Sequence, residues 1–148
     1  MGQQQLLLLV LGIVIVGLAV VVGIQAFSEN QKKSNADALV NDAIRIASDA
    51  QAWKLKPSAF GGGASAEDWT GLNFGQIGYT VGDTDLTAAE AGDADYENLN
   101  GVFELADDGA DLTITATSYE SDGTTAMNVV VLTVSGTTPG DIVTEINQ

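Results

Sequence analysis

The chain has 148 residues, five Lys and Arg, 20 Asp and Glu, and neither cysteine nor histidine. These absences exclude disulfides, thiolate metal sites, cysteine nucleophiles and every catalytic scheme that needs an imidazole, so we do not expect an enzyme. The net charge of −15 is unevenly spread, because all five cations lie within residues 1–56 and residues 57–148 carry only acids. A C-terminal part with only negative charges repels nucleic acid.

The chain begins with a long apolar segment. Leu6 through Ile24 are all apolar or glycine. In helical form this run spans roughly 28 Å, close to the thickness of the hydrocarbon core of a bilayer. A cleaved secretory signal opens with Lys or Arg and has a shorter apolar core, whereas residues 1–5 here carry no charged side chain. We therefore expect a retained membrane helix.

The helical pattern continues beyond the apolar run, but on one side only. Apolar residues recur three and four positions apart, as in an amphipathic helix: Ala36, Leu39, Val40, Ala43, Ile46, Ala47, Ala50 and Trp53. Pro57 and then Gly61-Gly62-Gly63 end the pattern. Because nothing breaks the chain between Leu6 and Lys56, we predict one helix of about fifty residues.

The last third of the chain changes to the alternation of β-strands. Four strands are predicted, at Gly101–Ala106, Asp111–Tyr119, Met127–Val134 and Asp141–Ile146. Asp108-Gly109 and Asp122-Gly123 are hairpin signals between them. We expect an antiparallel meander of about four strands lying against the apolar stripe of the helix, with Trp53, Phe74 and Val102 in the seam.

The region between the helix and the meander has a weaker pattern. Residues 75–81 predict a strand, and residues 84–98 an acidic loop or a short helix. The expected fold class is α+β, a long N-terminal α-helix packed on a small antiparallel β-sheet. Its parts are a hydrophobic membrane or filament-core helix (1–27), an amphipathic continuation of that helix (28–56) and an acidic β-rich globular domain (57–148).

This organisation resembles the type IV pilin superfamily. The local match is Gln5-Leu6-Leu7, followed by an aliphatic run with an early glycine, Gly12; pilins place Glu-Leu-Leu ahead of such a run. The resemblance implies a lollipop-shaped subunit that is extracted from the membrane by a motor-driven platform. It also implies a filament whose core is packed N-terminal helices. Gln5 replaces the family's glutamate, so a salt bridge to a neighbouring amino terminus becomes at most a hydrogen bond.

The expected subunit interface follows from this resemblance and lies in the filament core. Its predicted residues are Gln5, Leu6, Leu9, Gly12, Ile13, Val16, Gly17, Val20, Ile24 and Phe27. Gly12, Gly17 and Gly23 suit a bundle contacted from several sides, although membrane helices also simply tolerate glycine. Residues 3–5 either form amide hydrogen bonds between subunits or are a polar flank of the membrane helix.

The charged residues allow two interpretations. The cations Lys32, Lys33, Arg45, Lys54 and Lys56 either pair with acidic domains of neighbouring subunits or form an ordinary solvated face, which we favour. The acidic pairs Asp83/Asp85, Asp93/Asp95 and Asp107/Asp108 contain oxygen ligands suited to calcium, but none has EF-hand spacing. We favour surface charge and expect no metal and no cofactor.

The aromatic side chains are few and scattered, which favours packing in a core or an interface over a stacking platform. Beyond Phe27, they are Trp53, Phe60, Trp69, Phe74, Tyr79, Tyr96, Phe103 and Tyr119.

Two functions remain after these exclusions. The first is the structural subunit of an extracellular pilus-like helical filament on the cell surface. Its partners are copies of itself, the pilus assembly machinery and, before assembly, the cytoplasmic membrane. The alternative is a monomeric single-pass membrane-anchored surface protein with an acidic ligand- or ion-binding domain. A membrane-tethered hydrolase is a third reading, for which the sequence offers no catalytic residue.

Overall fold

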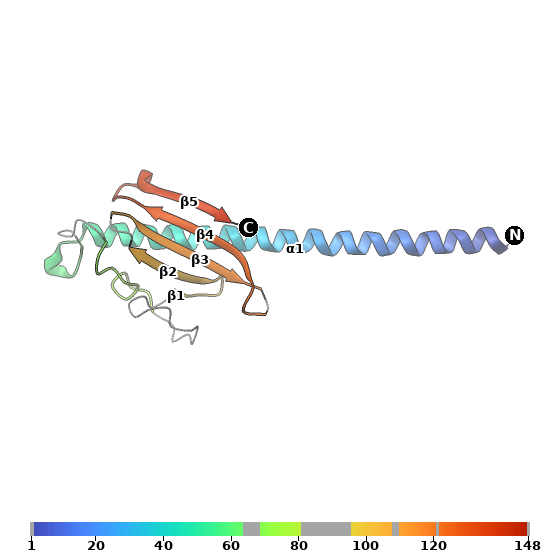
Figure 1. The fold of residues 1–148 in the computed structure, drawn as a ribbon, viewed down its shortest axis with the longest axis horizontal. Coiled ribbons are helices and arrows are strands. Elements are labelled where there is room, and N and C mark those ends of the chain that lie inside the picture. The colour runs from blue at the N-terminus through green and yellow to red at the C-terminus, as the bar shows by residue number, and fades with distance from the viewer. Residues whose placement is uncertain (1, 64–68, 81–95, 108–109, 121, 148) are drawn as a thin grey trace. The chain divides into compact units, whose positions relative to one another are not determined.

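The computed structural model describes residues 2–63, 69–80, 96–107, 110–120 and 122–147. The fold is α+β, with one long N-terminal helix, α1 (Gly2–Leu55), packed against a small antiparallel sheet (Figure 1). The chain divides into two units, residues 1–34 and residues 35–148. The first contains the N-terminal part of α1, and the second contains the rest of α1 and the sheet.

Helix α1 confirms the predicted single helix of about fifty residues. It contains no proline, and its last residue is Leu55, two positions before Pro57. The clash of a proline ring with the preceding residue disfavours helical geometry there, which explains the end of the helix. A 3₁₀ turn, Ser58–Phe60, follows, and Gly61 closes it with a left-handed φ of 78°.

The sheet has five antiparallel strands in sequence order, each paired with the next. They are β1 (Tyr96–Glu97), β2 (Val102–Asp107), β3 (Leu112–Tyr119), β4 (Ala126–Val134) and β5 (Ile142–Asn147). Strands β2 to β5 confirm the four predicted strands. The expected number of strands was too low by one, because a two-residue strand such as β1 is too short to show alternation.

The predicted hairpin at Asp122-Gly123 connects β3 and β4. The Asp122 carboxylate accepts hydrogen bonds from the backbone N–H of Thr124 (3.0 Å) and of Thr125 (2.9 Å), and from the Thr125 hydroxyl (2.6 Å). These bonds, those of Thr125 first, lower the pKa of Asp122 to about 2. The other predicted hairpin signal, Asp108-Gly109, lies outside the described residues.

The core forms where α1 packs on the sheet. Every predicted residue of the helical stripe is buried except Val40, which is half-buried. On β3, residues 112, 114, 116 and 118 are buried and alternate with half-buried threonines. This alternation places one face of the sheet against the helix and leaves the other face open. The buried sheet residues of the core cluster are Phe103, Leu105, Leu112, Ile114, Ala116, Val130, Leu132 and Val134.

The expected seam residues are all buried but do not all join the main cluster. Phe74 belongs to it. Trp53 instead packs under the glycine-rich segment that follows α1, where its indole N–H donates to the Gly61 carbonyl (3.0 Å). A Cβ on Gly63 would lie 2.4 Å from the Trp53 ring, so the segment passes directly over the indole. Val102 is buried at the start of β2, outside this cluster.

The strand predicted at residues 75–81 is wrong. Residues 75–78 form turns, in which the Gln76 N–H donates to the Asn73 carbonyl (3.1 Å), and residues 79–80 are irregular. Gly78 has a φ of 89°, a conformation that no β-strand uses. Ile77 and Tyr79 are half-buried and alternate with exposed residues, but they do so from turns and irregular chain and not from a strand. Of the predicted loop or helix at 84–98, residues 84–95 lie outside the described residues and Tyr96–Glu97 form β1.

Candidate assembly surface

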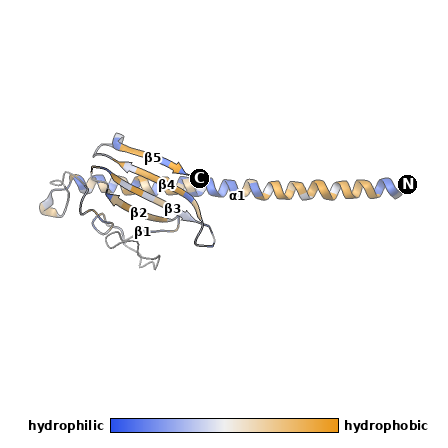
Figure 2. Ribbon diagram, in the orientation of Figure 1, coloured by the Kyte–Doolittle hydropathy of each residue, from blue (hydrophilic) through white to orange (hydrophobic). Residues whose placement is uncertain are grey.

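The N-terminal unit exposes apolar side chains on every side of α1. The large apolar residues between Leu6 and Phe27 are each 50–70% exposed. Figure 2 shows this part of α1 as almost continuously hydrophobic, in contrast to the mixed colouring of its C-terminal part. A helix that is apolar all round needs lipid or other helices around it. This surface is therefore incomplete in the isolated chain.

The same segment meets the length and composition of a membrane span. Signal sequences near a chain's N-terminus meet the same criteria. The apolar part of α1 is thus a candidate membrane anchor or signal sequence.

The predicted interface residues all lie on α1, within this exposed segment, and most of them share one side. Gln5, Leu9, Val16, Val20 and Phe27 recur at helical spacing, so they form one stripe along α1. The stripe is not distinguished by its exposure, because apolar residues on the other sides of the helix are equally exposed. The structure describes these residues in one copy, and their role in an interface stays a prediction.

Glycines leave gaps in this apolar surface. A Cβ built on Gly12, Gly17 or Gly23 meets nothing within 4 Å outside the helix's own backbone. Small residues on a helix let another helix backbone approach closely. These three positions are accordingly the places where a neighbouring helix can pack most tightly.

The cations of the C-terminal unit all lie on or just after α1. Lys54 lies over the ring of Trp69, with its ammonium 5.2 Å from the ring centroid. Arg45 and Lys56 are exposed. Unit 35–148 has three cations and 19 acids, a formal charge of 3 − 19 = −16. Pairing of these cations with other copies stays a prediction.

The predicted acidic pairs offer little that could hold an ion in the described residues. Asp83, Asp85, Asp93, Asp95 and Asp108 lie outside them. The Asp107 carboxylate accepts a hydrogen bond from the Thr70 hydroxyl (3.2 Å). Within the part of the chain that the structure describes, no group of three or more His, Cys, Asp or Glu residues could hold a metal ion.

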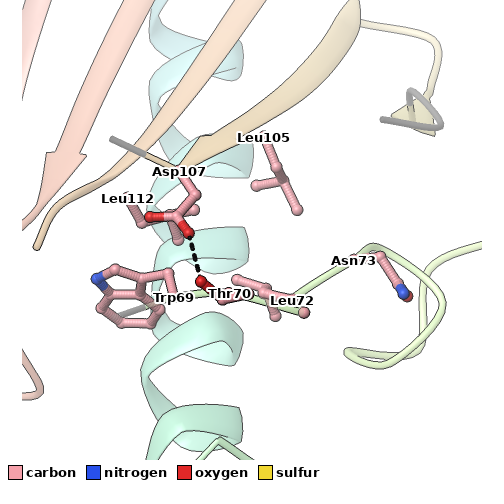
Figure 3. A pocket seen from close by; sticks show the side chains of 8 residues that line it. Trp69, Thr70, Leu72, Asn73, Leu105, Asp107 and Leu112 are labelled. Atoms are coloured by element: carbon pink, nitrogen blue, oxygen red, sulfur yellow. Dashed lines mark hydrogen bonds between the residues drawn. The ribbon is translucent and has the colours of Figure 1, made fainter. Parts of the chain in front are cut away.

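A small pocket lies beside this hydrogen bond (Figure 3). Its volume is about 270 Å³, and its walls come from the segment around Trp69 and from β2 and β3. Asp107 is the one charged side chain among its lining residues, which are Trp69, Thr70, Gly71, Leu72, Asn73, Leu105, Asp107 and Leu112. Its lining mixes apolar and polar side chains, and its one carboxylate is already bonded to Thr70, which is too little to define a ligand.

Four of the aromatic residues that are scattered in the sequence come together in the fold. Phe74, Tyr79, Tyr96 and Phe103 form a chain of ring contacts with centroids 4.8–6.2 Å apart. Phe74 and Phe103 are fully buried, so the cluster is core and offers no stacking platform. The Tyr79 hydroxyl donates to the Asp49 carboxylate (2.7 Å). Burial first, and then this hydrogen bond, raise the pKa of Tyr79 above its usual range.

A polar network that the sequence analysis missed fastens the β1–β2 turn to α1. The Asp42 carboxylate accepts from the side-chain amides of Asn98 (2.9 Å) and Asn100 (2.7 Å). Asn35 donates to the Asn100 carbonyl (3.1 Å) and accepts from Asn128 (3.0 Å). The Asn100-Gly101 dipeptide was an available turn signal, but the partner Asp42 is 56 residues from Asn98 in the chain.

Comparison of the chain with protein-family models, with curated proteins and with solved structures gives no match.

Proposed function

We propose that the protein is the structural subunit of an extracellular pilus-like helical filament. In this filament the N-terminal helices form the core and the acidic domains form the surface. The observation that carries the proposal is that α1, exposed and apolar on all sides near its N-terminus, continues without a break into the core of a folded domain.

The continuity of the helix matters because it determines how the domain is attached to the apolar segment. A protein that needs only an anchor can join it to its domain through any flexible linker, and flexible linkers are rich in Gly and Ser. Here the anchor and the main core element are one helix, Gly2–Leu55. Packing of the apolar segments against one another would then fix the attachment of every domain. That is the requirement of a regular polymer.

The charge of the domain suits an outer surface. Unit 35–148 has a formal charge of −16, and strong net charge of one sign keeps surfaces soluble and opposes nonspecific association. Between copies this charge is repulsive, so the attraction that assembles the filament comes from the uncharged apolar helices. The partners are copies of the chain, the membrane before assembly and the assembly machinery.

A second function is supported by the apolar segment considered alone. Its length and composition fit one membrane crossing, so a monomeric membrane-anchored surface protein with an acidic binding domain is the competing proposal. The two proposals differ in whether lipid or protein surrounds the apolar helix.

A substitution that increases both apolarity and volume separates them. Gly17→Leu makes the segment more apolar and thus retains or improves membrane insertion. In a packed helical core it introduces a large side chain at a close contact, at a cost of about 1–3 kcal/mol per subunit. Val14→Leu is the control, because it keeps the segment apolar and adds only one methylene.

The experiment is electron microscopy of the fraction sheared from cells, with mass spectrometry to identify the subunit in it. We expect filaments from the native chain and from Val14→Leu. For Gly17→Leu we expect the chain in the membrane fraction and few or no filaments. If all three chains remain in the membrane and none appears in a polymer, the filament proposal is wrong.

A further inference from the structure

Two turns of unit 35–148 each expose a large apolar side chain. Leu99 is fully exposed, at the apex of the turn between β1 and β2. Phe60 is 73% exposed, at the end of the 3₁₀ turn that follows α1. Isolated exposed apolar residues are normal on protein surfaces. These two differ from that background in how firmly their turns are held and in the charges beside them.

The turn that carries Leu99 is held by a dense set of hydrogen bonds. The Asn98 side-chain oxygen accepts from the backbone N–H of Asn100 (2.8 Å) and of Gly101 (3.2 Å), and Asn98 N–H donates to the Gly101 carbonyl (3.0 Å). Asp42 then ties both asparagine side chains to α1. Leu99 is the one exposed residue of the turn 98–101. A contact through it therefore requires little ordering of the backbone, which favours binding.

The turn that carries Phe60 is held in a comparable way. Phe60 N–H donates to the Pro57 carbonyl (3.0 Å), and Gly61 N–H donates to the Ser58 carbonyl (3.0 Å). The Trp53 indole N–H donates to the Gly61 carbonyl (3.0 Å), which fixes the turn on the end of the helix. Leu55, 64% exposed, precedes this turn and adds apolar surface at the same end of the helix.

The two turns lie at opposite ends of the part of α1 that packs on the sheet (Figure 1). The Leu99 turn is bonded to Asn35 and Asp42, and the Phe60 turn to Trp53. At 1.5 Å per residue, Asn35 and Trp53 are roughly 27 Å apart along the helix. One copy of the chain thus cannot bring its own two turns together.

The charges beside the two turns are opposite. Lys56, exposed, immediately precedes Pro57 at the Phe60 turn. Glu97, exposed, lies on β1 two residues before Leu99. In a unit of formal charge −16, most approaches of one copy to another are repulsive. An approach that brings the Phe60 turn of one copy to the Leu99 turn of another instead places a cation near an acid.

We propose that successive copies contact one another head to tail, the Leu99 turn of one domain against the Phe60 turn of the next, with Glu97 facing Lys56. The two surfaces differ, so the contact is heterologous and repeats without limit unless it closes into a ring. The inference rests on the proposed filament function, for which it supplies the contact between domains.

Cysteine cross-linking of the full chain tests this contact. The native chain has no cysteine, so a chain with Ser58→Cys and Leu99→Cys has one thiol at each turn. A disulfide needs Cα atoms within about 7 Å, which the separation of the turns within one copy excludes. We expect oxidation to give a ladder of covalent dimers, trimers and longer multimers from the double variant, and no covalent product from either single variant.

The outcomes separate this inference from the proposed function. Filaments without a ladder overturn the head-to-tail contact and leave the filament function standing. A ladder from detergent-solubilised chain that forms no filaments supports the contact and counts against the function. Dimers from a single-cysteine variant indicate a symmetric contact and overturn the proposal. Absence of both filaments and ladder overturns both proposals.

Exchange of the two charges in the double-cysteine chain gives a second measurement. Lys56→Glu or Glu97→Lys alone places like charges at the contact, and we expect the yield of the ladder to fall several-fold. The two changes together restore an opposite pair, so the yield should recover. Glu145→Lys, an exposed acid on β5, is the control and should leave the yield unchanged. If only net charge mattered, Lys56→Glu would lower the yield whereas Glu97→Lys and Glu145→Lys would both raise it, and that result would refute the contact.

Discussion

Removal of the Asp42 carboxylate should detach the β1–β2 turn from α1. Asp42→Ala deletes the acceptor of two side-chain hydrogen bonds, at 2.9 Å from Asn98 and 2.7 Å from Asn100. Hydrogen bonds to charged groups contribute about 1.5–3 kcal/mol each. Because Asp42 is half-buried, we take the low end of that range and expect a loss of about 2–3 kcal/mol. For a chain of this size the loss corresponds to a fall in Tm of about 4–10 °C.

The matched control is Asp37→Ala on the same helix. Asp37 is exposed, and its substitution removes the same charge and brings the same gain in helix propensity. We expect it to change the free energy of unfolding by less than about 0.5 kcal/mol. Both variants can be followed through the fluorescence of the buried Trp53 and Trp69 during denaturation of the detergent-solubilised chain. If the two variants are equally stable, the network around Asp42 does not stabilise the domain and the reasoning is refuted.

Three further predictions concern the domain. Gly101→Ala should destabilise it by about 1–3 kcal/mol in the same unfolding assay, because the added Cβ would lie 2.4 Å from the Thr117 carbonyl oxygen and 2.8 Å from Leu39. Gly140→Ala is the control and should be nearly neutral, because its Cβ would meet no atom of the described residues, its chain neighbours aside, closer than 4.0 Å. Tyr79 should stay protonated when exposed tyrosines ionise, because its pKa is raised. The stability that it contributes is therefore complete below about pH 10 and is lost as the pH rises beyond that. An ultraviolet titration in which Tyr79→Phe removes absorbance change near pH 10 would contradict this. The lowered pKa of Asp122, about 2, makes its contribution present above the unfolded pKa near 4 and lost as pH falls toward 2. Thr125→Ala removes the hydroxyl donor and keeps the backbone one, so it should raise that pKa in a carbon-detected NMR titration. An unchanged value would show that the Thr125 hydroxyl bond does not cause the shift.

The elements with a strong period could be predicted from the sequence. Helix α1 is apolar throughout in its N-terminal part and has apolar residues at helical spacing in its C-terminal part. Strand β3 alternates apolar residues with threonine over six positions, 112–117. Prediction failed where alternation occurs outside a strand and where a strand is too short to show a pattern. Residues 75–80 place Ile77 and Tyr79 against the core from turns and irregular chain, and β1 exists because β2 offers a partner and not because Tyr96–Glu97 has a pattern of its own.

The candidate assembly surface was predictable only in part. A long apolar run indicates that something must surround it, but the side that meets another copy is a property of the assembly and is not encoded in periodicity. The Leu99 and Phe60 turns were not identified from sequence, because their rigidity comes from contacts such as Asp42 with Asn98 and Trp53 with Gly61 that join residues from different elements.

The central claim is that protein, and not lipid, surrounds the apolar part of α1 in the functional state. The most direct test is helical reconstruction by electron cryo-microscopy of material sheared from cells that make this chain, with the subunit identified by mass spectrometry. We predict thin regular filaments in which residues 2–27 of each copy pack against the same segment of other copies. Recovery of the chain only as a monomer in the membrane fraction, with no polymer in the sheared material, would contradict the account and favour the membrane-anchored alternative.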